Sequence, residues 1–256
     1  DGRMADPIQI ELAAAALFSR QEAALSVDRS WSGRRLLVSA GPTLEAIDAV
    51  RLISNRSSGR MGVLLAQVAR LRGADVELVH GPLQVPQAWL EGLECEPVES
   101  AEQMQQALHR RQDQASALAM VAAVADLRRS DGGLPSKPPK SGLPQLFEQG
   151  WEPVPDLLRG LVDRRPAGQR ILGFAALTGA DHDLLMRGGE KRAGKGCDLL
   201  MVNPIDRAGE GFGENQASGW LLGDGLQQRV PLKSKLAVAH HLLDALGELL
   251  QTTTSC

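Results

Sequence analysis

Residues 35–43 read RLLVSAGPT, residues 61–71 read MGVLLAQVARL and residues 76–79 read VELV. The first and the last are short apolar runs, and the first ends in a Gly-Pro turn. Between them the apolar residues recur at helical spacing, and Gly73 follows where such a helix should end. Strand, helix and strand in this order predict one unit of a parallel sheet with its crossover helix.

The same alternation continues along the chain. Its further elements are predicted at residues 100–111 (helix, with Ser100 as N-cap), 117–122 (buried strand), 171–175 (strand), 184–194 (helix) and 199–202 (strand). Strands of this length joined by helices predict an α/β fold with a doubly wound, mostly parallel, Rossmann-like sheet. Ligands of such sheets bind beyond the C-terminal ends of the strands.

Three segments do not follow the alternation. Residues 1–33 hold one helix that starts at Asp6-Pro7, so we expect a tail or linker before a domain of residues 34–256. Residues 128–154 are rich in Gly, Pro, Ser and Lys without a helical period, which predicts a long functional or mobile loop. The helix expected at 234–250 is amphipathic and should cover the sheet.

Composition excludes several classes of function. The 256 residues are 43% hydrophobic and 23% charged, with a net charge of −3, so nucleic acid and anionic lipid are not general partners. Aromatic residues make up 3% and Tyr is absent, which argues against a stacking platform for single strands. The longest apolar run, residues 117–125, is far shorter than the roughly 20 residues of a membrane helix, and we expect no signal segment.

The cysteines and histidines show no metal-binding pattern. Cys95, Cys197 and Cys256 are widely separated, and the five His form no HxxxH or HExxH motif. We therefore expect neither a disulfide scaffold nor a metal held by protein ligands, and we expect a reducing cytoplasm.

Three groups of residues are candidates for chemistry. The run Ile53–Gly62 places Ser57, Ser58 and Gly59 before the 61–71 helix, where a phosphate could bind, although simple N-capping is the alternative. Asp126 ends the small-residue run 121–126 and could accept hydrogen bonds from a ligand, or cap its own turn. The cationic candidates are Lys137 and Lys140 in the loop and Lys191 and Lys195, four apart on one helix face. For the second pair a solvated helix face is the alternative to phosphate binding.

Residues 48–62, DAVRLISNRSSGRMG, resemble the signature D-P-V-R-x-I-S-N-x-S-S-G-K-M-G of phosphopantothenate–cysteine ligase. Further motifs of that family are matched in order by AAVAD (122–126), KPPK (137–140), PDLL (155–158), GFAALT (173–178), Lys191 to Lys195, CDLL (197–200) and GFG (211–213). The resemblance spans residues 34–245. GRMADP (2–7) is similar to the G-R-M-x-E-P that closes an upstream flavin-dependent decarboxylase domain in bacterial fusions.

The resemblance implies a reaction that joins 4′-phosphopantothenate to L-cysteine in coenzyme A biosynthesis. The carboxylate of the first substrate would attack CTP, giving an acyl-cytidylate and pyrophosphate, and the cysteine amine would then displace CMP. Mg²⁺ would be bound mainly by phosphates. The family further implies a homodimer, formed by a dimerisation extension, and a flexible lysine-bearing loop. The upstream partner would be a phosphopantothenoylcysteine decarboxylase domain.

The resemblance also implies residue roles. Asn55 and Lys137 would be catalytic, Asn55 as a donor to the oxyanion of the second step and Lys137 at the triphosphate. Ser57, Ser58 and Gly59 would bind phosphate or substrate. The nucleotide would be bound by Met120, Val121, Ala122, Asp126, Lys137, Pro155, Asp156, Leu157, Leu158, Phe174, Lys191 and Lys195.

The chain departs from the family pattern at several positions. KPPK replaces K-I-K-K, which leaves open whether Lys137 or Lys140 is the loop lysine. Leu177 replaces a glutamate, Pro204 an aspartate and Pro42 a glycine. Two alternatives therefore stay open, namely a non-catalytic nucleotide-binding relative and an NAD(P)-dependent reductase. The absence of G-x-G-x-x-G after the first strand argues against the reductase.

Overall fold

Strand β1 (Arg35–Ala40) lies at the centre of the fold. Its side chains alternate between two cores, with Leu36 and Val38 in one and Leu37 in the other, as the two-residue period of a strand requires. It pairs in parallel with β4 (Asp75–His80) and β6 (Ala117–Met120). The apolar run at 35–39 is therefore buried on both faces, as expected for the centre of a parallel sheet.

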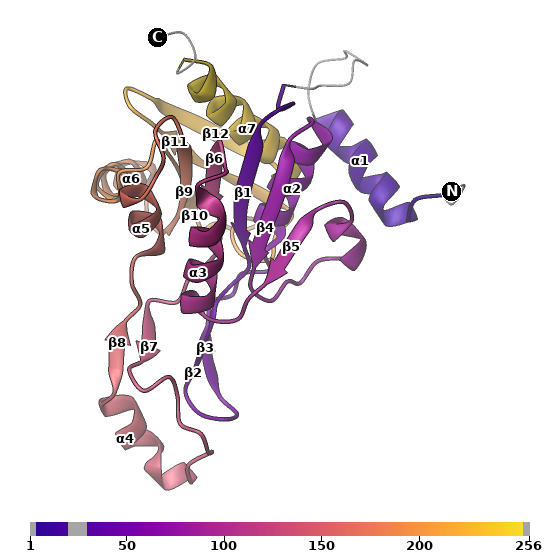
Figure 1. Cartoon of the computed structure of the whole chain (residues 1–256). Coiled ribbons are helices and arrows are strands. Elements are labelled where there is room, and N and C mark those ends of the chain that lie inside the picture. The colour runs from indigo at the N-terminus through magenta and orange to yellow at the C-terminus, as the bar shows by residue number, and fades with distance from the viewer. Residues whose placement is uncertain (1–3, 20–29, 253–256) are drawn as a thin grey trace.

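The computed structural model describes residues 4–19 and 30–252, in which eight strands form one sheet in the order β12-β11-β10-β9-β6-β1-β4-β5 (Figure 1). The outer members are β5 (Glu94–Pro97), β9 (Arg170–Leu177), β10 (Leu199–Pro204), β11 (Gln216–Leu222) and β12 (Gln227–Ser234). All neighbours from β5 to β10 are parallel, and β11 and β12 add an antiparallel edge. The predicted doubly wound α/β fold is confirmed, whereas β5, β11 and β12 were not predicted.

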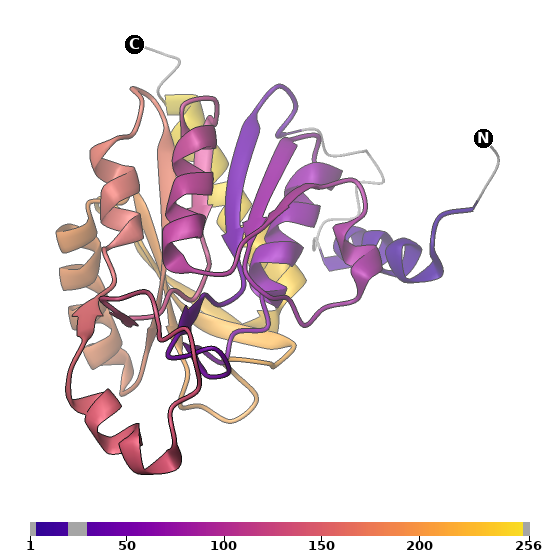
Figure 2. The same ribbon diagram turned by 60° about the horizontal axis from the view of Figure 1, so that its bottom comes forward.

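Helices cover both faces of the sheet. One face carries α2 (Arg60–Leu71) and α7 (Lys235–Thr252), and the other carries α3 (Ala101–Gln112), α5 (Leu157–Asp163) and α6 (Asp181–Lys195). Figure 2 shows α3 in front of the sheet and the yellow α7 behind it. None of the helices in the described ranges is both long and apolar enough to cross a membrane.

The N-terminal helix α1 (Pro7–Ser19) packs on the domain. The carboxylate of Asp6 accepts a hydrogen bond from the amide of Ile8 at 2.8 Å, and Ala16 is buried with its carbonyl oxygen 2.7 Å from His240 Nε2. Trp31 is fully buried in the core beneath α2 and α7. The boundary at residue 33 stays a prediction, but part of the expected tail belongs to this core. The predicted motif residues Gly2 and Arg3, and Cys256, lie outside the described residues.

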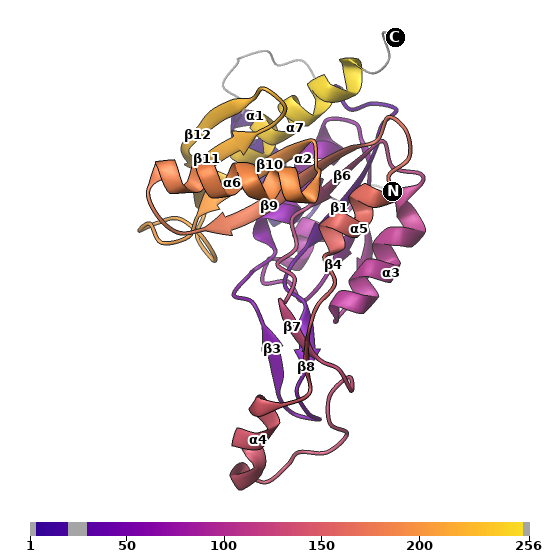
Figure 3. The same ribbon diagram turned by 90° about the vertical axis from the view of Figure 1, so that its left-hand side faces the viewer.

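Two ribbons project from the end of the sheet at which the parallel strands have their C-terminal residues (Figure 3). One is β2 (Leu44–Ala46) with β3 (Leu52–Ser54), and the other is β7 (Leu127–Arg129) with β8 (Trp151–Pro153). Between β7 and β8 lie the 3₁₀ helix η2 (Lys140–Gly142) and the helix α4 (Leu143–Glu148). A second 3₁₀ helix, η1 (Gln87–Leu90), precedes β5. We call residues 44–54 and 127–153 the arm.

The prediction of a loop without helix at 128–154 is wrong at α4. Six residues are less than two helical turns, so no apolar period can be read from them. Pro144 lies in the first turn, where its missing N–H costs nothing. The ring of Phe147 stacks on that of Trp151 with centroids 5.8 Å apart, which joins α4 to β8.

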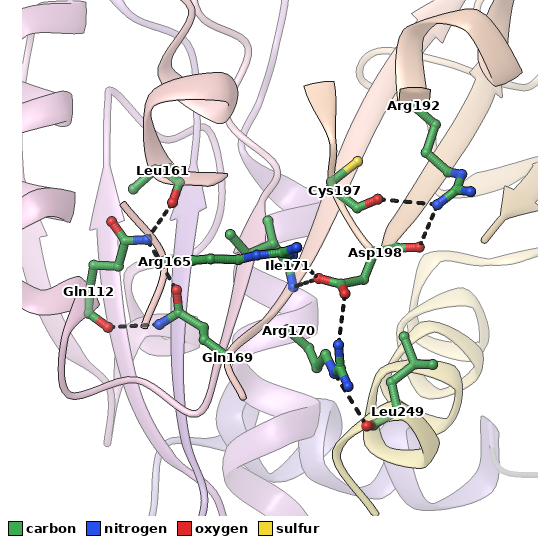
Figure 4. A network of polar contacts seen from close by, with 10 residues as sticks. All are labelled: Gln112, Leu161, Arg165, Gln169, Arg170, Ile171, Arg192, Cys197, Asp198 and Leu249. Carbon is green, nitrogen blue, oxygen red and sulfur yellow. Dashed lines mark hydrogen bonds and ion pairs between the residues drawn. The ribbon is translucent and has the colours of Figure 1, made fainter. Parts of the chain in front are cut away.

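A network of polar contacts links helices and strands at the opposite end of the sheet, where the parallel strands begin (Figure 4). The carboxylate of Asp198 accepts hydrogen bonds from the amide of Ile171 at 2.8 Å, from Arg165 at 2.9 Å and from Arg170 at 3.1 Å. Gln169 donates to the carbonyl oxygen of Gln112 at 2.7 Å. Asp198, which belongs to a family-like motif, therefore stabilises the fold at the edge away from the arm.

Candidate active site

A cavity of about 670 Å³ opens at the C-terminal ends of β6, β9 and β10, beside the first residues of α2, α5 and α7. Strands β4 and β6 pair with opposite edges of β1, so the cavity lies at the reversal of strand order where doubly wound sheets bind ligands. All predicted site residues except Lys137 line it, namely Asn55, Ser57, Ser58, Gly59, Met120, Val121, Ala122, Asp126, Pro155, Asp156, Leu157, Leu158, Phe174, Lys191 and Lys195.

The loop before α2 leaves the helix N-terminus open. Gly59 is the N-cap with φ +74°, a conformation that favours glycine, and a Cβ there would lie 3.1 Å from the backbone nitrogen of Gly41. The hydroxyls of Ser57 and Ser58 accept from the amides of Gly59 at 3.2 Å and Arg60 at 3.4 Å. Gly59 has no side chain to cap α2, and Ser58 engages only the first amide of the helix, at 3.4 Å. The N–H groups that follow in the first turn suit an anion, and phosphate binding by the serines stays a prediction beside capping.

Asn55 fixes the backbone that follows β6. Its Nδ2 donates to the carbonyl oxygens of Ala123 at 3.1 Å and Val124 at 2.9 Å. Both amide hydrogens are thus engaged within the protein. Asn55 therefore lies in the cavity wall as predicted, but with two partners that the sequence did not indicate.

Two residues that sequence reasoning missed hold the same segment, Ser39 near the end of β1 and Thr43 in the turn that follows it. The buried hydroxyl of Ser39 accepts from the amides of Val121 and Ala122, each at 3.1 Å, and donates to Met120 Sδ at 3.1 Å. The hydroxyl of Thr43 accepts from the amide of Ala125 at 3.0 Å. The available signal was a polar residue at the end of an otherwise apolar buried strand, because a buried hydroxyl needs partners.

Asp126 lies at the exposed end of this segment. Its carbonyl oxygen accepts from the amide of Val154 at 2.9 Å, which joins the start of β7 to the turn before α5. Its carboxylate has no hydrogen-bond partner among the described residues. Asp126 therefore does not cap its own turn, which was the alternative to ligand binding. The carboxylate remains available to a ligand in the cavity.

The two predicted lysines of α6 differ in their surroundings. Lys195 forms an ion pair with Asp156, whose other oxygen caps α5 by accepting from the amide of Arg159 at 3.0 Å. Lys191 is exposed and has no ion-pair partner in the described ranges. Phe174 of β9 also lines the cavity, but it packs against the core on the α2 and α7 face of the sheet, opposite α6.

Charge in the cavity favours an anionic ligand. Its lining includes the cationic side chains of Arg60, Lys191, Lys195 and Lys235 and the carboxylates of Asp126 and Asp156. Of these, Arg60 and Lys235 were not predicted as site residues. An excess of cations in a partly enclosed cavity concentrates anions there.

Lys137 lies outside the cavity, exposed on the arm. Its charge acts on Asp48 at the start of the turn between β2 and β3. Burial opposes ionisation of Asp48, but hydrogen bonds from the amides of Val50 and Arg51 and the charges of Arg51 and Lys137 together keep its pKa below the ordinary value. The catalytic role of Lys137 stays a prediction.

Of the three single-residue departures from the family pattern, two lie away from the cavity and one lines it. Leu177 is buried in the core of the α3, α5 and α6 face and does not line the cavity. Pro42 lies in a tight turn, where a Cβ on Gly81 would meet its carbonyl oxygen at 1.7 Å. Pro204 does line the cavity, beside Asn203, which donates to the carbonyl oxygen of Ser218 at 3.0 Å.

Known proteins resemble this chain over almost its whole length. It is 37% identical to the coenzyme A biosynthesis bifunctional protein CoaBC of Mycobacterium tuberculosis over 99% of the chain and 61% of that protein. It is 31% identical to CoaBC of Bacillus subtilis over 98% of the chain and 59% of that protein. The chain thus spans about three fifths of the length of these curated relatives.

A solved structure has the same fold. The crystal structure of the C-terminal domain of a CoaBC protein superimposes with a TM-score of 0.69 at 27% identity, covering 88% of this chain and 99% of that domain. The family described as DNA/pantothenate metabolism flavoprotein C-terminal domain matches residues 31–250. Because that match takes in the sheet, the cavity and the arm together, the chain belongs to the family of the DNA/pantothenate metabolism flavoprotein C-terminal domain.

Proposed function

We propose that this chain joins 4′-phosphopantothenate to L-cysteine with CTP, a step of coenzyme A biosynthesis. The observation that carries the proposal is the single cavity in which Asn55, Asp126 and Lys191, from three distant stretches of chain, come together. The similarity to coenzyme A biosynthesis proteins supports the pathway. The excess of cations in the cavity supports phosphorylated substrates.

The proposed reaction has two steps. An oxygen of the phosphopantothenate carboxylate forms a bond to the α-phosphorus of CTP, and the bond to the pyrophosphate leaving group breaks. The cysteine amine then forms a bond to the acyl carbon, loses a proton and expels CMP. Activation is needed because a free carboxylate is a poor electrophile, whereas the mixed anhydride has a good leaving group.

The residues take the following roles in this proposal. The backbone after β6 and Asp126 bind the cytidine, with the ring of Phe174 and the turn before α5 as walls. Lys191 and Lys195 bind phosphate oxygens, for which Lys195 exchanges Asp156 for the ligand. Asn55 can leave one carbonyl partner and donate to the oxyanion of the second step, because a hydrogen bond to an ionised acceptor is roughly twice as strong as one to a neutral acceptor.

Mg²⁺ enters the proposal with the triphosphate. Among the described residues no group of three His, Cys, Asp or Glu side chains could hold a metal. Mg²⁺ commonly takes its ligands from substrate phosphates, water and one or two carboxylates. In the cavity the carboxylate without a protein partner is that of Asp126, so Asp126 is the side chain that could complete such a set.

The assembly is also a proposal. Val50, Leu52, Leu127 and Phe147 expose apolar side chains on the arm, and we propose that this surface contacts a second copy in a homodimer.

Relatives of greater length support a fusion to an upstream flavin-dependent decarboxylase domain. The cytoplasm remains the proposed location, with which the free thiols of Cys95 and Cys197 agree.

The test is pyrophosphate release measured with phosphopantothenate and either CTP or ATP, followed by CMP release on addition of cysteine. We expect release with CTP that requires phosphopantothenate. Binding of CTP without turnover would favour the non-catalytic relative. Binding of NADPH in place of CTP would favour the reductase.

A further inference from the structure

Lys235, the first residue of α7, is a buried cation inside the cavity. It is only 7% exposed, yet it lines the cavity. Within residues 4–19 and 30–252 its Nζ has one hydrogen-bond partner, the carbonyl oxygen of Gly211 at 3.2 Å, and no ion pair with a carboxylate. Buried charges in proteins are as a rule paired with an opposite charge. This ammonium is an exception, because it has no such partner among the described residues.

The surroundings of Lys235 do not compensate its charge. Burial lowers the pKa of its ammonium, the charge of Arg60 lowers it further, and the charge of the exposed Glu214 only partly opposes them. The carboxylate of Glu210 is hydrogen-bonded to the hydroxyl of Ser218. The protein therefore holds a cation here that an anionic ligand would stabilise.

Arg60 adds a second cation on the same side of the sheet. It is the first residue of α2, with its guanidinium 5.7 Å from the ring centroid of Trp89 and hydrogen-bonded to Asn215. Its Nε is buried and has no hydrogen-bond partner. This unpaired donor is a second observation that points to a ligand, independent of the burial of Lys235.

These two cations lie across the sheet from the lysines of α6. Helices α2 and α7 pack on one face of the sheet and α6 on the other. Lys191 and Lys195 thus enter the cavity from the opposite face, and Lys195 already has Asp156 as a partner. One cavity therefore has two separate cationic walls.

We propose that Lys235 and Arg60 form a second phosphate-binding subsite of this cavity, and that Lys235 gains its counter-ion only when a ligand phosphate enters. The proposal deepens the proposed function and rests on it for the identity of the ligand. The chemistry recognised is a phosphoryl group with two negative charges. It comes either from the terminal phosphates of a nucleoside triphosphate or from the phosphate monoester of the acid substrate.

The test compares Lys235→Met with Lys233→Met, a matched control two residues earlier on β12 that does not line the cavity. Calorimetric titrations would use pyrophosphate, CTP, CMP, phosphopantothenate and pantothenate. We expect Lys235→Met to weaken binding of pyrophosphate by roughly tenfold or more, as for the loss of one hydrogen bond to a charged group. The melting temperature should stay equal or rise, because an uncompensated buried charge is removed.

The two sources of phosphate are separated by the other titrations. Weaker CTP with unchanged CMP assigns the subsite to the terminal phosphates, and weaker phosphopantothenate with unchanged pantothenate assigns it to the monoester. If Lys235→Met does not fold, Arg60→Gln is measured in its place. The proposal is overturned if every phosphorylated probe binds within twofold of the wild-type value, or if the wild type binds no pyrophosphate. A wild type that binds pyrophosphate but neither CTP nor phosphopantothenate would instead refute the proposed function.

Discussion

The side-chain nitrogen of Asn55 lies 2.9 Å from the carbonyl oxygen of Val124. Asn55 precedes α2, whereas Val124 follows β6, so this bond joins the two loops that form one wall of the cavity. The same nitrogen donates to the carbonyl oxygen of Ala123. A residue that resembles a catalytic asparagine thus also has a positioning role, and the two roles predict different kinetics.

We expect Asn55→Ala to release pyrophosphate at a near-normal rate and to form the amide about 10²–10³ times more slowly, as for the loss of one oxyanion donor. The acyl-cytidylate should accumulate, which rapid quenching and mass spectrometry would detect. Equal slowing of both steps would instead show that holding the carbonyls of Ala123 and Val124 is its main role.

Ser39→Ala should weaken CTP binding and destabilise the fold. The substitution leaves the half-buried amides of Val121 and Ala122 without their shared acceptor, at a cost of about 1 kcal/mol for each hydrogen bond lost. Urea unfolding and CTP titration would measure both effects. The matched control is Ser116→Ala at the opposite end of β1, where the hydroxyl accepts from the amide of Arg35 at 3.3 Å. It should alter stability slightly and CTP affinity not at all.

The sequence predicts the part of the fold that depends on local patterns. β1 and α2 follow from an apolar run and a helical period, and Gly73 ends the helix with φ +91°. β12 could not be read in this way, because its solvent-facing residues leave Val230 as its one buried side chain and Pro231 interrupts it. An edge strand of this kind is recognisable only through its partner β11.

The site residues also differ in whether the sequence reveals them. Asn55, Asp126 and Lys191 lie in motifs that the sequence displays, and the fold brings them together. Lys235 begins a helix predicted only to cover the sheet, and its place is fixed by distant residues, because its Nζ donates to the carbonyl oxygen of Gly211 and its amide to that of Asn215. Lysine at a helix start normally reaches solvent, so nothing local marks this one as buried.

Asp48 makes the arm sensitive to acid. Its pKa is lowered in the folded protein, so its ionised form stabilises the fold above the ordinary pKa of aspartate, near 3.9, and that contribution is lost as the pH falls through the folded value. Asp48→Asn should reduce the dependence of the unfolding free energy on pH below about pH 4. Asp113→Asn, at an exposed helix end, is the control. Identical acid profiles for wild type and Asp48→Asn would contradict the prediction.

Leu52→Glu should shift the proposed dimer toward monomer. Leu52 is 55% exposed on β3, within the apolar surface of the arm, and a buried unpaired carboxylate at an interface is unfavourable. Sedimentation velocity would measure the change. Leu232→Glu is the matched control, since Leu232 is 48% exposed on β12 away from the arm. A monomeric wild type, or a dimer unchanged by Leu52→Glu, would refute the arm as the interface.

Lys137→Gln should suppress pyrophosphate release, while Lys140→Gln should leave it largely unchanged. Both lysines are exposed on the arm, and neither lines the cavity, so either could reach the triphosphate only through a change in the arm or across an interface. Lys137 is the one whose charge acts on Asp48, at the base of the turn between β2 and β3. Stopped-flow detection of pyrophosphate would separate the two variants. Loss of release in Lys140→Gln alone would assign the loop lysine to Lys140.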